Sequence, residues 1–265
     1  MEKTLTDFSL ESDIDLIKID QTSMNTKIVS YYKNERIAIL GAGRGLGYSI
    51  AHHLISQIEN IPLWLSSRKI ISKFETHPNY SPTNKDFVLF PMDYTKPLAV
   101  DKIVESLCLF MPTKIIYCAG GGPFGPFQEK SWSSHLWAIQ LNFLFPGEFL
   151  HQLLKIRSTN IPSLKQIIFV GSSIAEDKAD PGASSYSASK HGLRGLVRSI
   201  VCENQSEQPL DIRLYSPGYM NTELLTPNSR PRRDGSKIAE PQKIADDLLH
   251  WAMTPANPND WHRIP

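Results

Sequence analysis

The sequence has few cysteines and no sustained hydrophobic run. Its three cysteines, Cys108, Cys118 and Cys202, are widely spaced and form no C-x-x-C pair, which argues against a disulfide framework or a zinc ribbon. No run approaches the ~20 apolar residues of a membrane span. The acidic N-terminal stretch contains no uninterrupted apolar segment, so a secretory signal is not expected either. We therefore expect reduced thiols, no membrane partner and a cytoplasmic protein.

A large net charge is absent as well. Lys and Arg total 28 against 27 Asp and Glu, so the formal net charge is +1 and no global field attracts nucleic acid. The eight histidines include the neighbours His52 and His53 but no H-E-x-x-H motif. Adjacent side chains on a helix point in different directions, so we expect no metal site. This composition favours a small-molecule partner.

Short aliphatic runs alternate with longer amphipathic segments from residue 36 onward. This order is typical of βαβ units that close a parallel sheet. Strands are expected at 36–40, 62–67, 87–92, 114–119, 166–172 and 211–216, and helices at about 45–58, 97–109, 131–157, 184–204 and 240–252. The pattern predicts an α/β fold, a three-layer doubly wound Rossmann-type parallel sheet of six or seven strands flanked by helices. The proline-rich end, 254–265, leaves a seventh strand short or missing, so six is the safer count.

The chain is expected to form one domain over residues 36–265, since no internal repeat or linker interrupts it. Residues 1–35 are interpreted as an N-terminal extension on the surface of that domain, because their apolar positions are interrupted by acidic residues without a sustained period. Within the domain, residues at about 223–240 are rich in Pro, Ser, Asn and Gly, and we expect them to form a substrate lid.

A glycine-rich loop follows the first expected strand. It reads Gly41-Ala42-Gly43-Arg44-Gly45-Leu46-Gly47 and fits the pattern G-x-x-x-G-x-G. Glycine permits a tight strand-to-helix turn and lets backbone amides approach a pyrophosphate, whose charge a helix N-terminus favours. The loop therefore predicts a dinucleotide site. The alternative is a glycine-rich turn that binds nothing.

The end of the second expected strand indicates which dinucleotide is bound. An NAD site places an acidic residue there for the ribose 2′-hydroxyl, whereas this chain has Ser66-Ser67-Arg68. Arg68, together with Arg44 of the glycine loop, can hold a 2′-phosphate by charge-assisted hydrogen bonds, so NADP(H) is favoured. Asp93, after the third strand, is a candidate for the adenine amino group, although an Asp at a strand end is as often a helix cap.

A serine, a tyrosine and a lysine follow the fifth expected strand. Ser173 stands thirteen residues before Tyr186, and Lys190 lies four residues after Tyr186. Positions i and i+4 share one face of a helix, so the ammonium can approach the phenol. A nearby cation lowers the tyrosine pKa from its ordinary value of about 10. These groups suit hydride transfer to or from a carbonyl or alcohol, with Tyr186 moving the proton and Ser173 orienting the substrate oxygen.

Together, these motifs resemble those of the short-chain dehydrogenase/reductase family over roughly residues 36–222. The resemblance implies that Asn142 supports a proton-relay water and that Lys190 also holds the nicotinamide ribose. It further implies cofactor contacts from Ala119, Gly120, Pro217, Gly218 and Thr222, and a homodimer built on the two long helices after the fourth and fifth strands.

The chain departs from the family pattern after the fourth expected strand and just before the glycine loop. Cys118 stands where the family commonly has asparagine in Asn-Ala-Gly, and Leu40 occupies a frequent threonine position. A thiol is a weaker hydrogen-bonding group than an amide. The C-terminal region is also short compared with many members, which puts a tetramer in doubt more than the activity.

Two segments are expected to frame the substrate. Phe124 and Phe127, in the glycine-rich stretch 120–127, line an apolar pocket or pack beneath their loop. Arg230, Arg232 and Arg233 of the expected lid could meet an anionic substrate, but a solvated charge run is the favoured interpretation.

Two other functions compete with a reductase. A serine hydrolase is disfavoured because the sequence around Ser173 lacks the second glycine of a nucleophile elbow. A non-catalytic NADP(H)-binding sensor or scaffold remains the alternative, although such a protein has no evident need for Ser173, Tyr186, Lys190 and Asn142 together. The sequence thus predicts an NADPH-dependent ketone or aldehyde reductase, reversible as an alcohol dehydrogenase.

Overall fold

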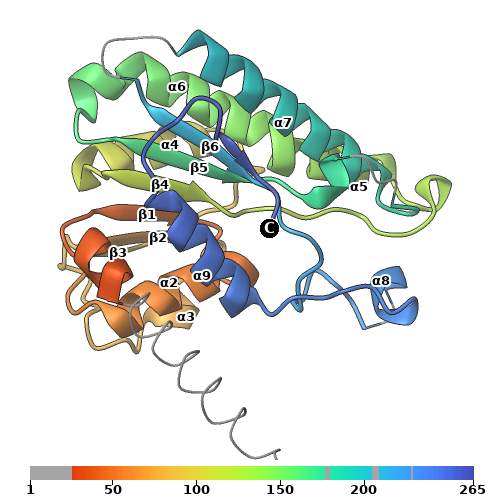
Figure 1. Ribbon diagram of the computed structural model, residues 1–265, viewed down its shortest axis with the longest axis horizontal. Coiled ribbons are helices and arrows are strands. Elements are labelled where there is room, and N and C mark those ends of the chain that lie inside the picture. The colour runs from red at the N-terminus through yellow and green to blue at the C-terminus, as the bar shows by residue number, and fades with distance from the viewer. Residues whose placement is uncertain (1–25, 177–179, 205–208, 228) are drawn as a thin grey trace, which may run out of the picture.

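The computed structural model describes residues 26–176, 180–204, 209–227 and 229–265. This part of the chain forms a parallel sheet in the order β3-β2-β1-β4-β5-β6-β7. The strands are β1 (Ile37–Leu40), β2 (Leu63–Ser67), β3 (Phe87–Pro91), β4 (Lys114–Tyr117), β5 (Gln166–Val170), β6 (Asp211–Tyr215) and β7 (His262–Arg263). Figure 1 shows helices covering both faces of the sheet, which makes the three layers expected from the sequence.

Alternate residues of each central strand supply two separate hydrophobic cores. In β1, Ala38 and Leu40 face one core, whereas Ile37 and Ile39 face the other, and all four are fully buried. Strands buried on both faces read as continuous apolar runs, which is why these segments were recognisable in the sequence.

The helices divide between these two cores. The helices that pack against the first core are α4 (Ala99–Phe110), α5 (Trp132–Ile139), α6 (Phe145–Asn160) and α7 (Ser184–Glu203). Those that pack against the second core are α2 (Gly45–Gln57), α3 (Ile71–Phe74) and α9 (Pro241–Ala252). The short α8 (Arg230–Arg233) lies beyond the carboxyl ends of the strands (Figure 1). In α9, buried residues recur at helical spacing from Ala245 to Leu248, Leu249 and Ala252, so one face of this helix meets the sheet.

The expected strands and helices are confirmed, with three differences. The six-strand count is too low, because two residues of β7 pair in parallel with Leu214 and Tyr215. The single helix expected at 131–157 contains a π-helical turn, Gln140–Leu144, between α5 and α6. Such turns are frequent at functional sites. The third difference lies at the N-terminal boundary.

Residues 26–32 are helical and belong to the packed body. Ile28 and Tyr32 are buried in the second core, and the Tyr32 hydroxyl donates to the Leu249 carbonyl oxygen at 2.9 Å. A surface extension reaching residue 35 is therefore wrong for these residues, because Ile28 and Tyr32, four residues apart on one helix face, are buried in the second core. The remainder of the expected extension lies outside the described residues.

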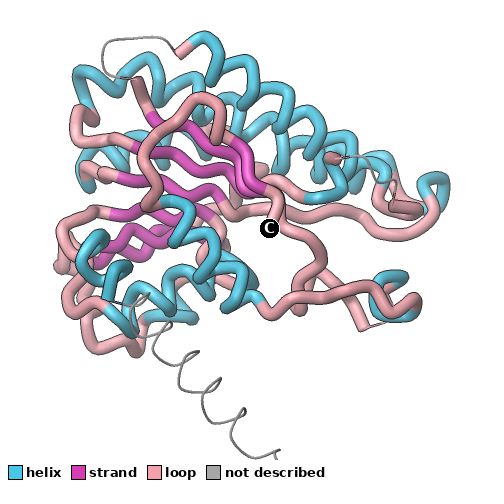
Figure 2. Tube along the Cα trace, in the orientation of Figure 1, coloured by secondary structure: helices cyan, strands magenta, loops and turns pink. Residues whose placement is uncertain are grey.

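The strand order places one crevice at the carboxyl edge of the sheet. From β1 the chain proceeds to β2 on one side, and β4 pairs with β1 on the other side. In a parallel sheet the loops from two such neighbours leave in opposite directions and open a crevice between them. Figure 2 shows the long loops gathered at this edge, where the C-terminus also lies.

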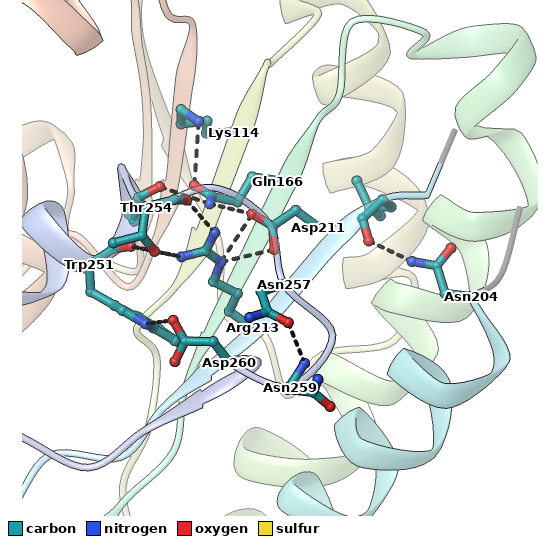
Figure 3. Close-up of polar contacts among 12 residues, drawn as sticks. Lys114, Gln166, Asn204, Asp211, Arg213, Trp251, Thr254, Asn257, Asn259 and Asp260 are labelled. Atoms are coloured by element: carbon teal, nitrogen blue, oxygen red, sulfur yellow. Dashed lines mark hydrogen bonds and ion pairs between the residues drawn. The ribbon is translucent and has the colours of Figure 1, made fainter. Parts of the chain in front are cut away.

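A buried polar network occupies the opposite edge, where β4, β5 and β6 begin (Figure 3). Arg213 is 1% exposed, and its guanidinium donates from Nε to the Asp211 carboxylate at 2.9 Å. Its Nη1 and Nη2 donate to the carbonyl oxygens of Trp251 and Thr254, each at 2.7 Å. These carbonyls lie at the C-terminal end of α9, where a cation also complements the helix dipole. Arg213 therefore fastens α9 to the sheet.

Replacing Arg213 with methionine is expected to lower the free energy of unfolding by about 3–5 kcal/mol, because it leaves the Asp211 carboxylate without its buried partner. Asp86→Asn breaks an ion pair with Arg36 in which the Asp86 side chain is 60% exposed, and it is expected to cost less than about 1 kcal/mol. Equilibrium urea unfolding measures both. Equal losses would contradict the role assigned to Arg213.

Candidate active site

The crevice at the carboxyl edge is a cleft of about 1950 Å³. It brings together most of the residues selected from the sequence, and the ones that line it are Gly41, Gly43, Arg44, Gly45, Leu46, Ser67, Arg68, Asp93, Ala119, Gly120, Ser173, Tyr186, Lys190, Pro217, Gly218 and Thr222. Gly47 and Asn142 lie behind the lining. Among the described residues, no three His, Cys, Asp or Glu side chains are grouped as metal ligands, and no helix is long and apolar enough to cross a membrane.

The glycine loop forms a tight turn between β1 and α2. Gly41 has φ of +91°, and a Cβ atom there would lie 2.5 Å from the backbone nitrogen of Ala119. A side chain at this position would thus push β1 and β4 apart. Helix α2 begins at Gly45 and makes no side-chain cap hydrogen bond. Its first amides and its dipole therefore remain available for an anion such as a pyrophosphate.

The end of the cleft next to β2, where Ser67 and Arg68 lie, suits a dinucleotide. The Ser67 hydroxyl is buried without a hydrogen-bond partner. A Cβ at Gly43 would meet this hydroxyl, so a larger residue there would have to displace the Ser67 side chain. Arg68 follows Ser67 along the cleft wall. An unpartnered donor, a small residue and a cation in one wall fit the polar groups of a nucleotide.

Asp93 caps a turn at the edge of the cleft, and its expected contact with the adenine amino group stays a prediction. It lines the cleft, and its carboxylate accepts hydrogen bonds from the Thr95 amide at 3.0 Å and the Thr95 hydroxyl at 2.8 Å. Burial raises the pKa of Asp93, but the hydrogen bonds from Thr95 and the charge of Arg68 oppose this, and the pKa is lowered overall. Asp93 is thus an ionised turn cap at the edge of the cleft.

Arg44, the second cation expected at the nucleotide, already forms an ion pair. Its Nη1 lies 3.1 Å from Glu223 Oε2, and both side chains are more than half exposed. The pair joins the glycine loop to the segment that follows Thr222. An exposed pair of this kind contributes at most about 1 kcal/mol, so a phosphate can replace the Glu223 carboxylate as the partner of Arg44.

Tyr186 and Lys190 lie on one face of α7, as their spacing predicted. The Lys190 ammonium lies 5.7 Å from the centre of the Tyr186 ring and donates to the Val170 carbonyl oxygen at 2.7 Å. Burial lowers the pKa of Lys190 from 10.5 to about 8. Burial also raises the pKa of Tyr186 above 10, an effect that the Ser172 side chain opposes. The phenol is therefore protonated at neutral pH.

Two serines, not one, face the cleft beside Tyr186. The expected Ser173 donates its amide to the Pro217 carbonyl oxygen at 2.9 Å, which fixes it next to the Pro-Gly element. Ser172, which the spacing rule passed over, also lines the cleft, and its side chain acts to lower the pKa of Tyr186 against the effect of burial. A thirteen-residue spacing distinguishes the two positions only by comparison with a family pattern, so the residues alone gave no signal for Ser172.

Asn142 lies within the π-helical turn, fully buried behind the cleft wall. Its amide nitrogen donates to the carbonyl oxygens of Gly121 and Ala138, each at 2.7 Å, and its oxygen accepts from the Gly121 amide at 3.1 Å. The side chain of Asn142 therefore holds the loop after β4 against α5 and the π-helical turn.

The two segments that were expected to frame the substrate can be placed relative to the cleft. Phe124 lines the cleft, with its ring 5.7 Å from that of Tyr186, whereas Phe127 lies outside it against His135. Two of the three lid arginines remain partly exposed and also form contacts within the protein. Arg230 pairs with Asp180 and Asp234, and Arg232 donates to the Asn221 side chain and the Leu225 carbonyl oxygen.

Tyr94 is a site residue that the sequence did not reveal. Its buried hydroxyl accepts from the Gly41 amide at 3.0 Å and donates to the Ser66 carbonyl oxygen at 2.9 Å. It thereby supports the glycine loop in a chain where Leu40 and Cys118 replace the hydrogen-bonding residues common in the family. Burial raises the pKa of the Cys118 thiol to about 12, so this side chain is a neutral neighbour of Lys190.

Comparisons with known proteins agree with this geometry. A family model described as short chain dehydrogenase matches residues 35–233. Solved structures similar to this chain include 4-hydroxyisoleucine dehydrogenase complexed with NADH, at 19% identity and a TM-score of 0.73, with 87% of this chain and 96% of that chain covered.

Two further similar structures come from bacteria. A dehydrogenase/reductase from Sinorhizobium meliloti is 20% identical, with a TM-score of 0.69 and coverage of 92% and 98%. A short chain dehydrogenase from Burkholderia cenocepacia in complex with NADP is 16% identical, with a TM-score of 0.69 and coverage of 88% and 96%. The structures establish the fold, and the family model, which spans most of the chain, shows that this protein belongs to the short-chain dehydrogenase family.

Proposed function

We propose that this protein is an NADPH-dependent reductase of ketones or aldehydes, reversible as an alcohol dehydrogenase. The observation that carries the proposal is one continuous cleft with an uncapped helix N-terminus and two arginines at one end and the Tyr186–Lys190 pair at the other. When bound there, the reduced nicotinamide supplies hydride to the carbonyl carbon. The remaining chemistry belongs to side chains of this protein.

Tyr186 is proposed as the general acid. Its raised pKa keeps the phenol protonated, so it can give its proton to the carbonyl oxygen as the alcohol forms. The phenolate that results lies close to the Lys190 ammonium, which stabilises the negative charge. Lys190 is also proposed to hold the ribose hydroxyls of the nicotinamide half, because its side chain lines the cleft.

Ser173 is proposed to orient the carbonyl oxygen beside the phenol, and Ser172 to hydrogen bond with Tyr186 before proton transfer. Asn142 supports proton resupply indirectly by fixing the loop at Gly121. The proposed preference for NADP(H) rests on Arg44 and Arg68 and on the lack of a carboxylate in Ser66-Ser67-Arg68. A similar structure binds NADP and another binds NADH, so the fold accommodates either nucleotide.

A homodimer is part of the same proposal. Leu136 on α5 and Leu144 in the π-helical turn are each 49% exposed, and Leu154 on α6 is 38% exposed. Apolar side chains along these helices suit the helix-to-helix contact that the family resemblance implies.

The Tyr186→Phe variant is expected to lose about 10²–10⁴-fold in kcat, because it removes the proton donor. Absorbance at 340 nm follows NADPH oxidation with a panel of aldehydes, ketones and acyl thioesters. NADPH affinity should stay unchanged, and Tyr80→Phe, outside the cleft, should keep full activity. Turnover by Tyr186→Phe at the wild-type rate would remove Tyr186 from the mechanism, and NADPH binding without any turnover would favour the sensor.

Arg68→Ala is expected to weaken NADPH binding by about 10- to 100-fold, which corresponds to the loss of charge-assisted hydrogen bonds to one phosphate. NADH binding should change by less than about threefold, since NADH lacks the 2′-phosphate. Isothermal titration calorimetry measures both dissociation constants. Arg198→Ala, an exposed arginine of α7 outside the cleft, serves as the control. Equal losses for the two nucleotides would argue against NADP selection by Arg68.

NADPH affinity is expected to fall as the pH rises through about 8, because Lys190 is charged below its lowered pKa and neutral above it. Tyr186 does not cause this fall, since burial raises its pKa above 10. Fluorescence titration of NADPH between pH 6 and 10 measures the effect. Lys190→Arg keeps its charge over this range and should move the fall to higher pH, and a fall at the same pH in that variant would assign it to another group.

A further inference from the structure

Three side chains form a closed ring on the substrate side of the cleft. The Tyr219 hydroxyl donates to Asp180 Oδ2 at 2.8 Å, and Arg230 donates to Asp180 Oδ1 from Nε at 3.2 Å and from Nη2 at 2.9 Å. Arg230 Nη2 also donates to the Tyr219 hydroxyl at 3.2 Å, which closes the ring. All three residues line the cleft, and the Asp180 side chain is only 14% exposed.

The ring connects segments that are far apart in the sequence. Asp180 precedes α7 and its Tyr186, Tyr219 follows the Pro-Gly element, and Arg230 begins α8. Arg230 makes two hydrogen bonds with one carboxylate and a further 2.9 Å bond from Nη1 to Asp234. Charge-assisted bonds that share a guanidinium fork fix orientation as well as distance. An isolated surface ion pair would contribute much less.

A backbone contact extends the ring to the wall beside the phenol. The Gly125 amide donates to the Gly182 carbonyl oxygen at 2.8 Å, two residues after Asp180. Phe124, next to Gly125, places its ring 5.7 Å from that of Tyr186. Hydrogen bonds therefore connect the lid to residues 180–182, and residues 180–182 to the loop that contains Phe124. These segments surround the place where a substrate would lie.

We propose that Arg230 is a positioning residue for the carbonyl substrate: by binding Asp180 and Tyr219 it holds the lid and the Phe124 wall in the arrangement that presents the substrate to Tyr186. This inference rests on the proposed reductase function. Arg230 does not touch the reacting atoms, so its removal should weaken substrate binding and leave proton transfer and nucleotide binding intact.

The test compares Arg230→Gln with Arg233→Gln, a neighbouring arginine of α8 that lines the cleft but lies outside the ring. Arg230→Gln is expected to raise the KM for the best carbonyl substrate about tenfold, with kcat and the Kd for NADPH within about threefold of the wild type. Arg230→Lys should raise the KM less than Arg230→Gln does, because lysine keeps the positive charge. The double variant Asp180→Asn/Arg230→Gln should have a KM no higher than that of Arg230→Gln alone.

Hydrogen exchange followed by mass spectrometry gives a readout that needs no substrate. Amides of residues 180–186 and 219–227 should exchange faster in Arg230→Gln than in Arg233→Gln, whereas those of α2 should not change. An unchanged KM, or an equal rise in Arg233→Gln, overturns the proposal. If the wild type turns over no carbonyl, the proposed function fails, and unchanged exchange in both segments then overturns the ring's role independently.

Discussion

The parallel direction of all the strands is the constraint on which the rest of the structure depends. It brings the chain out of every strand at one edge, so the glycine loop after β1, Arg68 after β2, Asp93 after β3 and the serines after β5 converge although they are distant in sequence. The reversal of strand order between β1 and β4 then opens the cleft among them. Gly41 shows how tight this arrangement is, since a Cβ there would meet the backbone of Ala119.

Buried cations lie at both edges of the sheet and have different roles. Arg213, at the amino edge, is fully satisfied by the Asp211 carboxylate and by carbonyls at the end of α9, so it holds layers together. Lys190, at the carboxyl edge, has one carbonyl partner, a neutral thiol neighbour and a pKa lowered to about 8. An incompletely paired buried charge is costly for stability, and such a group is expected where chemistry requires a cation.

Much of the fold and part of the site could be predicted from the sequence, for identifiable reasons. Strands buried on both faces are visible as apolar runs, and Tyr186 and Lys190 share a helix face at a fixed spacing. Tyr94 and Ser172 were missed because their roles depend on hydroxyl positions that no spacing encodes. The Asp180, Tyr219 and Arg230 ring joins segments 39 and 50 residues apart, so only the folded chain reveals it. The two-residue β7 carries too little pattern to be recognised.

The crystal structure of the protein soaked or co-crystallised with NADP⁺ tests the central claim most directly. The account predicts the pyrophosphate over the first turn of α2, the 2′-phosphate within hydrogen-bond distance of Arg68 with Arg44 released from Glu223, and the nicotinamide beside Tyr186 with its ribose on Lys190. A nucleotide bound elsewhere, or bound in the cleft with the nicotinamide away from Tyr186, would contradict it.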